Sequence, residues 1–373
     1  MKVYYLSIST FADNQLNLLR HLAEDIDITY GVIVPCKRAN FTEQELRSSL
    51  DGQSKIKFEA FHLKYRFRDP RVIKTYLEII RSIKKADPDV VYFTNFDQVY
   101  INLLLLLINN NKTVIGFHDV ENHSNTRFDF LTNLGKNILF KNFKHFHTYS
   151  QSQAGILKKR YSDKKVYTIP LPLIGFGEGL SNAPQNKMIH FLFFGNILPY
   201  KGLDILLHAV NRLSKKHKNF RLVVAGRSSE WDKLYENIVE EREVMIKQVR
   251  FIENSEIPGF FEMADYVVLP YRDTTQSGPL MISYHYNVPV IASNAVGFRE
   301  FIKPGISGYV FDLDKENDLD RLLEEALHRS PAEYNQLKET QKQFVEANFS
   351  MNSIVERYNA MFSKASSDGR KSA

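Results

Sequence analysis

The chain has 373 residues, enough for two domains of ordinary size, and its 43% hydrophobic content can supply sizeable cores. A single cysteine, Cys36, excludes an internal disulfide and favours a reducing compartment. The net charge is a mild +6, and no leader peptide is visible before the first apolar run, so we expect a soluble or peripheral protein.

The first half of the chain alternates short apolar runs with amphipathic segments. Strands are predicted at 3–8, 28–34, 90–94, 114–117 and 146–148, and helices at 16–23 and 73–86. The leucine-rich run 101–108 is too short to span a bilayer and is predicted to be a buried helix. The stretch from about Cys36 to Pro70 has no clear period. This alternation predicts a largely parallel, doubly wound α/β sheet.

Two prolines and a glycine-rich segment mark a domain boundary near the middle of the chain. The expected division is a first domain at 1–173, a linker at 174–188, a second domain at 189–347, an amphipathic helix at 348–365 and a disordered tail at 366–373.

Three predicted strands of the second domain each end in a polar turn marked by glycine or proline. They are followed by the turns 195–202, 226–227 and 270–278, and the last of these opens a helix. In an open parallel sheet such turns share one edge, where ligands bind. Lys201 and Arg227 bring cations to that edge, and a helix start presents free N–H groups, so the pattern predicts an anion site.

Together these motifs resemble the nucleotide-sugar domain of the retaining glycosyltransferases of the GT-B fold, the large family four. The matching segments are GNILPYKG (195–202), VVAG (223–226), ADYVVLPY (264–271), PVIAS (289–293) and GISGYVF (305–311). The first half is similar more weakly, through FHDVENH (117–123) and the segment 147–172. The resemblance implies two Rossmann-like domains facing across a cleft, with the last helix packing back on the first domain.

The resemblance also implies roles for individual residues. The donor side would comprise Gly195, Asn196, Lys201, Gly226, Arg227, Arg272, Thr274, Thr275, Gln276, Ser277, Gly278 and Leu280. The implied catalytic residues are His118, Asp119 and Lys201, with the His118–Asp119 pair in the cleft and the histidine touching the donor sugar. Asn14 and His123 would lie on the acceptor side.

The chain departs from the family pattern at several of these positions. Most members carry two glutamates, which align with Thr274 and Ile282 here, so the ribose must be held in another way. A lost charge-assisted hydrogen bond of this kind is worth roughly 1.5–3 kcal/mol. Asn196 replaces a common arginine beside the diphosphate, and Arg227 or Arg272 are candidates to replace its charge. The usual amino-terminal glycine loop is replaced by the residues 10–14.

The implied reaction transfers a sugar from a UDP- or GDP-linked donor to a glycan or lipid-linked acceptor, with retention, in bacterial surface polysaccharide or lipopolysaccharide biosynthesis. Such an enzyme needs no metal. Asp312-Leu313-Asp314 is interpreted as a solvated loop, and the eleven histidines show no zinc spacing. Two alternatives stay open: an epimerase or phosphorylase of the same fold, and a non-catalytic nucleotide-sugar-binding scaffold.

Two stretches, 55–74 and 136–146, interleave basic and aromatic residues. They fit a solvated face or contact with an anionic membrane, whereas nucleic acid is disfavoured because no recognised module appears. We therefore expect a cytoplasmic protein that visits the inner membrane face.

Overall fold

A computed structural model of the chain describes residues 1–36, 41–96, 98–120, 129–178 and 188–371. The fold separates into two compact units, one formed by Met1–Pro172 with Met351–Ala373 and the other by Leu173–Ser350. Each unit holds its own parallel sheet, which confirms the predicted pair of Rossmann-like α/β domains.

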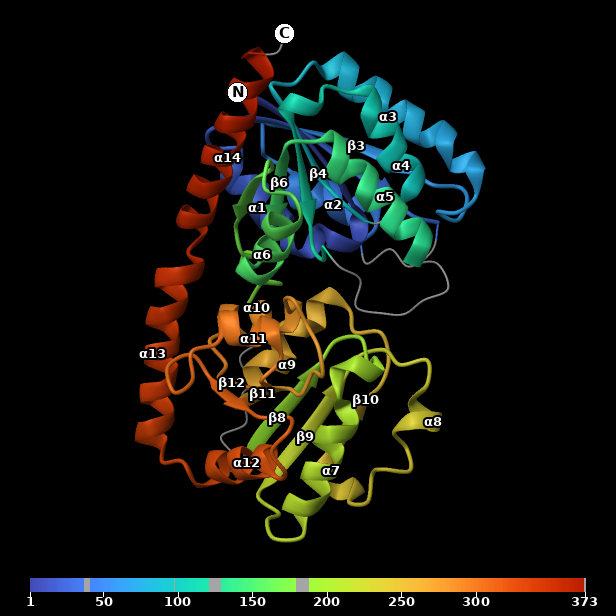
Figure 1. Ribbon diagram of the computed structural model, residues 1–373. Coiled ribbons are helices and arrows are strands. Elements are labelled where there is room, and N and C mark those ends of the chain that lie inside the picture. Colours follow the sequence, from blue (N-terminus) through green and yellow to red (C-terminus); the bar gives the residue numbers. More distant parts are fainter. Residues whose placement is uncertain (37–40, 97, 121–128, 179–187, 372–373) are drawn as a thin grey trace. The chain divides into compact units, whose positions relative to one another are not determined.

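The first unit is built on a seven-stranded parallel sheet with the order β3-β2-β1-β4-β5-β6-β7 (Figure 1). The strands are β1 (Lys2–Ile8), β2 (Asp27–Val34), β3 (Ile56–His62), β4 (Val90–Thr94), β5 (Thr113–Phe117), β6 (His145–Thr148) and β7 (Lys165–Thr168). The central strands are continuous apolar runs because helices cover both faces of the sheet. The order reverses between β1 and β4, and in open α/β sheets ligands bind at the carboxyl ends of the strands at such a point.

Helices of the first unit pack on the two faces of this sheet. They are α1 (Leu16–Leu22), α2 (Glu43–Leu50), α3 (Ile73–Ala86), α4 (Val99–Leu104), α5 (Asp129–Asn142), α6 (Gln151–Arg160) and α14 (Met351–Lys371). α3 turns Tyr76, Ile79 and Ile83 into the core, and it neighbours α4, which neighbours α5. The short 3-10 segments are η1 (Ser9–Asn14), η2 (Pro70–Val72), η3 (Leu105–Leu107) and η4 (Asn110–Lys112).

The second unit has a six-stranded parallel sheet with the order β10-β9-β8-β11-β12-β13. Its strands are β8 (Ile189–Phe194), β9 (Phe220–Ala225), β10 (Met245–Gln248), β11 (Tyr266–Leu269), β12 (Val290–Ser293) and β13 (Tyr309–Phe311). Its helices are α7 (Leu203–Ser214), α8 (Trp231–Leu234), α9 (Ile257–Met263), α10 (Gly278–His285), α11 (Val296–Phe301), α12 (Asp318–His328) and α13 (Pro331–Phe349), with the 3-10 turns η5 (Pro199–Lys201), η6 (Arg242–Val244) and η7 (Asn254–Glu256). Here the strand order reverses between β8 and β11.

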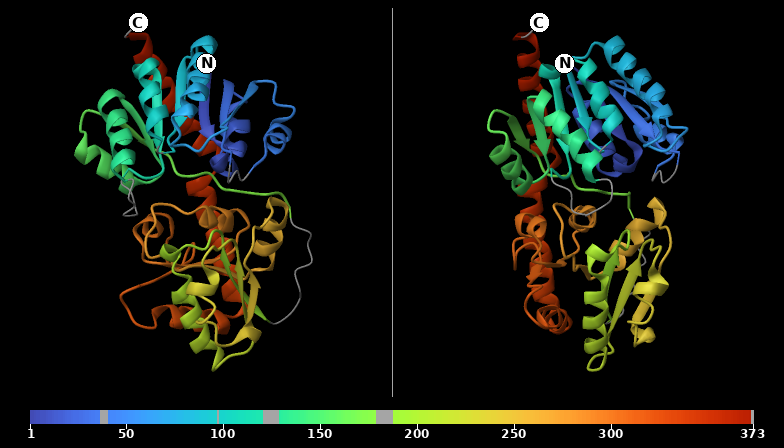
Figure 2. Two further views of the ribbon diagram at one scale, coloured as in Figure 1. Left: turned by 90° about the vertical axis from the view of Figure 1, so that its right-hand side faces the viewer. Right: turned by 45° about the vertical axis from the view of Figure 1, so that its right-hand side comes forward.

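The last helix, α14, packs on the first unit, as expected for the crossover helix. In both views of Figure 2 it runs alongside the strands of that unit. Tyr358 of this helix packs edge-on against Tyr92 of β4, with ring centres 5.9 Å apart. The predicted disorder of 366–373 is wrong as far as Lys371, because Asp368 pairs with Lys165 and lies 3.2 Å from the buried His145.

One other prediction needs correction, and one stretch without a clear sequence period contains regular elements. The stretch after Cys36 contains α2, which begins in a capping box between Thr42 and Glu45, and the edge strand β3. Edge strands carry a weak apolar signal, and β3 has no fully buried residue. The run 101–108 forms α4 and η3 rather than one buried helix, with Leu103 and Leu107 about half exposed (44% and 50%).

The expected linker belongs in part to the second unit. Phe176 donates its N–H to the Tyr286 hydroxyl (3.1 Å), which in turn donates to the Gly177 carbonyl (2.8 Å). Residues 179–187 of the linker lie outside the described residues.

Candidate functional site

The site of the second unit is built where the turns after β8 and β11 meet. The turn 195–202 lies against the strand end at Pro270: a Cβ on Gly202 would lie 2.0 Å from the Pro270 carbonyl oxygen. The Arg272 N–H also donates to the Tyr200 carbonyl (2.7 Å). The turns therefore form one structure at the point where the strand order reverses, which is where ligands bind in open α/β sheets.

Glycine is required where the turns after β8 and β9 touch. Gly226 has a φ of +145°, and a Cβ there would lie 1.9 Å from the Gly195 carbonyl oxygen. Gly195 itself has a φ of +107°, and a Cβ on it would lie 3.2 Å from Lys201 Nζ. The bare backbone of Gly195 thus leaves room for the lysine.

Lys201 places a cation directly over this backbone. Its side chain is buried, with 8% of the residue exposed, and Nζ lies 5.2 Å from the centre of the Tyr271 ring. Burial lowers the pKa of its ammonium group. Among the described residues no carboxylate forms an ion pair with Lys201. A buried cation without a counter-ion is costly, so the arrangement favours an anionic ligand.

The start of α10 supplies further donors. Ser277 caps the helix by accepting the Leu280 N–H (3.3 Å), so that N–H is used inside the protein rather than kept for a ligand. Pro279 has no N–H. At this helix start the donors left for a ligand are the backbone N–H groups of Ser277 and Gly278, in the part of the chain that the structure describes.

The polar turn before α10 is held by its own backbone and by α11. The Thr274 hydroxyl donates to the Gln276 carbonyl (2.7 Å), and the Thr274 carbonyl accepts the Gly297 N–H (2.9 Å). Thr274 and Thr275 are buried, and so is Ile282 at 5% exposure. The two positions that align with the glutamates of the resembling family are therefore enclosed, and neither carries a charge.

The two arginines considered as replacement cations differ. Nη1 and Nη2 of Arg272 donate to the carboxylate of Asp204, at 2.9 and 2.5 Å, and Nη1 also donates to the Pro199 carbonyl. The hypothesis that Arg272 supplies the missing charge is therefore not favoured, since its guanidinium clamps the Lys201 turn instead. Arg227 is exposed, lies 5.1 Å from the Phe251 ring centre and makes a long contact (3.4 Å) with the exposed Asn196.

In the first unit, His118 and Asp119 follow β5 as predicted. The His118 ring lies 4.4 Å from the Phe11 ring and 4.5 Å from the Tyr149 ring, between centres. Phe11 belongs to η1, the segment that also carries Asn14, so the structure brings this loop and His118 together. The Asp119 carbonyl accepts a hydrogen bond from the buried Lys136 (2.7 Å).

The electrostatics of this region keep His118 neutral. Burial lowers the pKa of His118 to about 4, against a smaller opposing effect of Asp119. Burial also raises the pKa of Asp13, beside Asn14, to about 6. The sequence analysis missed Asp13 and Tyr149, although the unusual loop 10–14 was a signal for Asp13. His123 lies outside the described residues.

The two basic-aromatic stretches are less exposed than their pattern indicates. Lys136 is buried at 1% exposure, and Phe140, Phe143 and Phe146 belong to the core of the first unit, which contradicts a surface role for these rings. In the first stretch, Lys57 pairs with Glu59, and Arg71 pairs with Asp69. In the described part of this first stretch, the exposed cations that form no ion pair are Lys55, Lys64, Arg66 and Lys74.

Two further acidic or histidine groupings bear on metals. Asp312 and Asp314 are exposed after β13, as expected for a loop. His217, Glu324 and His328, by contrast, converge in space with ligand atoms within 4.8 Å of one another, a grouping that the sequence analysis missed.

No described helix combines the length and the apolar character needed to cross a membrane.

Comparisons with known proteins agree with this architecture. Residues 181–345 match the family model described as Glycosyl transferases group 1. A 41.2 kDa protein in the cps region of Klebsiella pneumoniae is 24% identical over 178 residues, 48% of this chain and 47% of that protein. A glycosyltransferase of Haemophilus influenzae is 20% identical over 295 residues, 76% of this chain and 80% of its own. The chain thus spans only about half of the first of these relatives.

Solved structures share the whole fold. The Anabaena protein HepE in complex with UDP-glucose superimposes with a TM-score of 0.73 at 14% identity, covering 97% of this chain and 99% of that one. The two parallel-sheet units therefore have the GT-B architecture.

Proposed function

We propose that this protein is a retaining glycosyltransferase that uses a nucleotide-sugar donor, because residues 181–345 match the family model of the group 1 glycosyltransferases. The observation that carries the proposal is Lys201, a buried cation above the Gly195 backbone without a described carboxylate partner. A diphosphate is an anion of suitable charge for this place. The relative HepE, whose structure holds UDP-glucose, supports a donor of this class.

In the proposed reaction the bond between the anomeric carbon and the diphosphate breaks while the acceptor oxygen attacks from the same face. The acceptor proton goes to the departing phosphate oxygen, so no enzyme carboxylate is needed as nucleophile. Lys201 and the Ser277 and Gly278 N–H groups stabilise the negative charge that develops on the diphosphate. In this proposal, the side-chain cation and the helix start do the work for which other enzymes use a metal.

The acceptor is proposed to be a glycan or a lipid-linked glycan of a cell-surface polysaccharide. The relative in the cps region supports this assignment.

An apolar patch on the first unit adds to it: Leu103, Leu106, Leu107 and Leu134 are 37–50% exposed on the neighbouring segments α4, η3 and α5. The Tyr100 hydroxyl of α4 donates to the Arg68 carbonyl (3.5 Å), so the exposed Arg66–Arg68 segment borders this patch. Leucines bordered by cations suit peripheral contact with the anionic inner membrane face from the cytoplasm.

Calorimetric titration of the full chain with UDP and with GDP, followed by an assay of slow donor hydrolysis, tests the proposal. We expect one nucleotide to bind to the protein and Lys201→Ala to weaken that binding, whereas Lys233→Ala, which removes an exposed cation of the same unit, leaves it unchanged. Absence of nucleotide binding at millimolar concentration would favour the non-catalytic scaffold. Turnover of a nucleotide sugar without any acceptor, beyond slow hydrolysis, would favour the epimerase or phosphorylase.

A further inference from the structure

A second cluster of polar side chains lies in the second unit, between the end of α7 and one face of α12. Glu324 and His328 are four residues apart on α12, so they project from the same face of the helix. His217 follows α7, and its backbone N–H donates to the Leu213 carbonyl (3.0 Å), which holds the histidine against the end of that helix. α7 packs beside α12.

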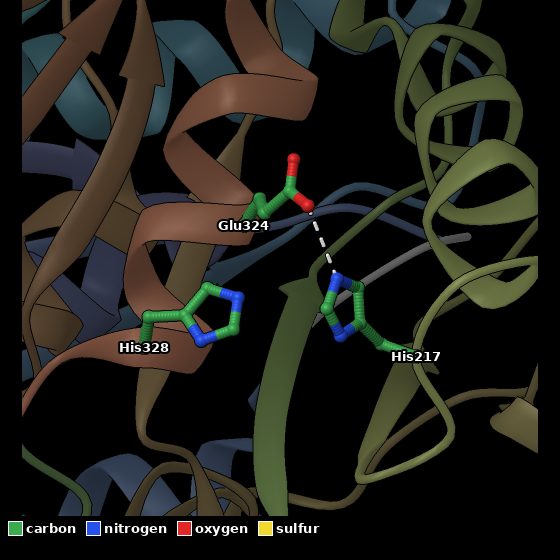
Figure 3. Close-up of side chains that lie close together, drawn as sticks. All are labelled: His217, Glu324 and His328. Atoms are coloured by element: carbon green, nitrogen blue, oxygen red, sulfur yellow. Dashed lines mark hydrogen bonds and ion pairs between the residues drawn. The ribbon is translucent and has the colours of Figure 1, made fainter.

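The three side chains surround a common space (Figure 3). His217 Nε2 lies 3.1 Å from Glu324 Oε1, and the ligand atoms of all three residues lie within 4.8 Å of one another. The two imidazole rings meet edge to face, with centres 5.2 Å apart. Two imidazoles bound tetrahedrally to one zinc ion, with Zn–N bonds of about 2.0–2.1 Å, would have ring centres roughly 5 Å apart.

From this geometry we infer that His217, Glu324 and His328 form a binding site for a divalent transition metal, with Zn²⁺ as the best match. Two imidazoles and one carboxylate are ligands that Zn²⁺, Co²⁺ and Ni²⁺ accept, whereas Mg²⁺ and Ca²⁺ prefer oxygen ligands. Three protein ligands leave one position for water. The bound ion ties α7 to α12, and this inference does not depend on the proposed transferase activity.

Neighbouring charged side chains affect the geometry of the site and the availability of its carboxylate. Arg212 holds Asp320, one turn before Glu324, through two hydrogen bonds of 2.6 and 2.8 Å, which fixes the spacing of the two helices. Lys216 Nζ lies 3.8 Å from Glu324 Oε2 and competes with a metal for the carboxylate.

Zinc binding to the full chain without an affinity tag tests the inference, measured by competition with a chromophoric chelator. We expect one Zn²⁺ per chain with a Kd in the micromolar range and a rise in the melting temperature. His328→Ala changes an exposed side chain and should weaken binding by at least about tenfold, and Glu324→Gln should also weaken it. Lys216→Ala should tighten it, because the competing ammonium is gone.

A matched control is His62→Ala. His62 pairs with Glu43 at 2.6 Å and thus forms the same kind of histidine–glutamate pair, but it belongs to no described three-ligand group. It should leave zinc affinity unchanged. Co²⁺ should give the intense visible absorption of a tetrahedral site in the wild type and lose it in His328→Ala. Absence of Zn²⁺ binding at micromolar concentrations, or binding that His328→Ala leaves intact, would overturn the assignment and leave an ordinary ion pair.

Discussion

The Lys201 ammonium group lies so close to the backbone of Gly195 that a Cβ on this glycine would be only 3.2 Å from Nζ. Lys201 is held in this place from both sides, by the left-handed turn at Gly202 and by the Arg272–Asp204 ion pair that clamps the same segment. The position of the cation is therefore a property of the turn as a whole and not of a freely moving side chain.

Replacement of Lys201 should abolish most of the catalytic advantage. Lys201→Ala is expected to lose about 2–5 kcal/mol of transition-state stabilisation, as for one partner removed from a buried charge-assisted contact. The measurement is kcat/KM for the donor, with Lys233→Ala as a control for loss of positive charge. A Lys201→Ala enzyme that keeps most of its kcat/KM would contradict the assignment.

Introducing glutamate at Thr274 and Ile282, where the resembling family carries it, should not strengthen donor binding. Thr274 and Ile282 are buried at 7% and 5% exposure, so a carboxylate at either position lacks solvent and has no prepared partner. We expect Ile282→Glu to lower the free energy of unfolding at pH 7, and the loss to shrink at acidic pH as the buried carboxyl takes up its proton. Urea unfolding at both pH values measures this, with Ile282→Met as an apolar control.

The donor affinity of the folded Thr274→Glu/Ile282→Glu protein then distinguishes a functional variant of the turn from a decayed site. An unchanged or lower affinity fits a functional variant of the site. Tighter donor binding would instead indicate a site that has decayed from the common pattern.

The stability of the first unit should depend on pH through His118. Its folded-state pKa of about 4 lies below its ordinary value of 6.5, so between these values the unfolded chain binds a proton that the folded protein does not. Stability is therefore expected to fall as the pH drops from 6.5 towards 4, by at most about 1.4 kcal/mol per pH unit for this one group. Urea unfolding from pH 4 to 7 should show a shallower dependence of stability on pH in His118→Gln than in the wild type.

Vesicle binding should require both the leucines and the salt-sensitive charge of the first unit. Sedimentation with anionic liposomes at low salt is expected to capture the protein, and added salt should release it, because each Lys or Arg near the surface is worth roughly 1 kcal/mol. Leu106→Ser/Leu107→Ser should reduce the bound fraction, and Val296→Ser, which changes an even more exposed apolar residue of the other unit, should not. A protein that stays in the supernatant at low salt would show that these charges form only a solvated face.

The carboxy-terminal turns of α14 should contribute to the stability of the first unit. Asp368 pairs with Lys165 and lies beside the buried His145, and Lys165 lowers the pKa of its carboxyl. The ion pair is exposed on one side, so Asp368→Ala should cost about 0.5–1 kcal/mol at pH 7, and the difference should vanish at a pH low enough to protonate Asp368 in the wild type. Ser367→Ala, on the exposed side of the same turn, is the control in this urea titration.

The sequence by itself determined much of the architecture, because the signals involved are local. Val90–Thr94 and Val290–Ser293 are continuous apolar runs, and Gly195, Gly202 and Gly226 mark turns that require positive φ angles. Such patterns depend on neighbours along the chain, so they placed the parallel sheets, the donor-side turns and Lys201. The signal was weakest where burial is partial, as in the edge strand Ile56–His62.

Only the tertiary structure decided which charged side chains are already paired inside the protein and which side chains distant in the sequence come together. The sequence suggests Arg272 as a ligand-binding cation, whereas in the structure its guanidinium pairs with Asp204, 68 residues away. The sequence suggests Lys136 as a surface charge, whereas in the structure it is buried and donates a hydrogen bond to the Asp119 carbonyl. The cluster of His217, Glu324 and His328 could not be recognised as a group of three in the sequence, because 107 residues separate His217 from Glu324. Contacts of this range depend on how α7 and α12 pack, and that packing is a sum of many side-chain contacts that no local pattern records.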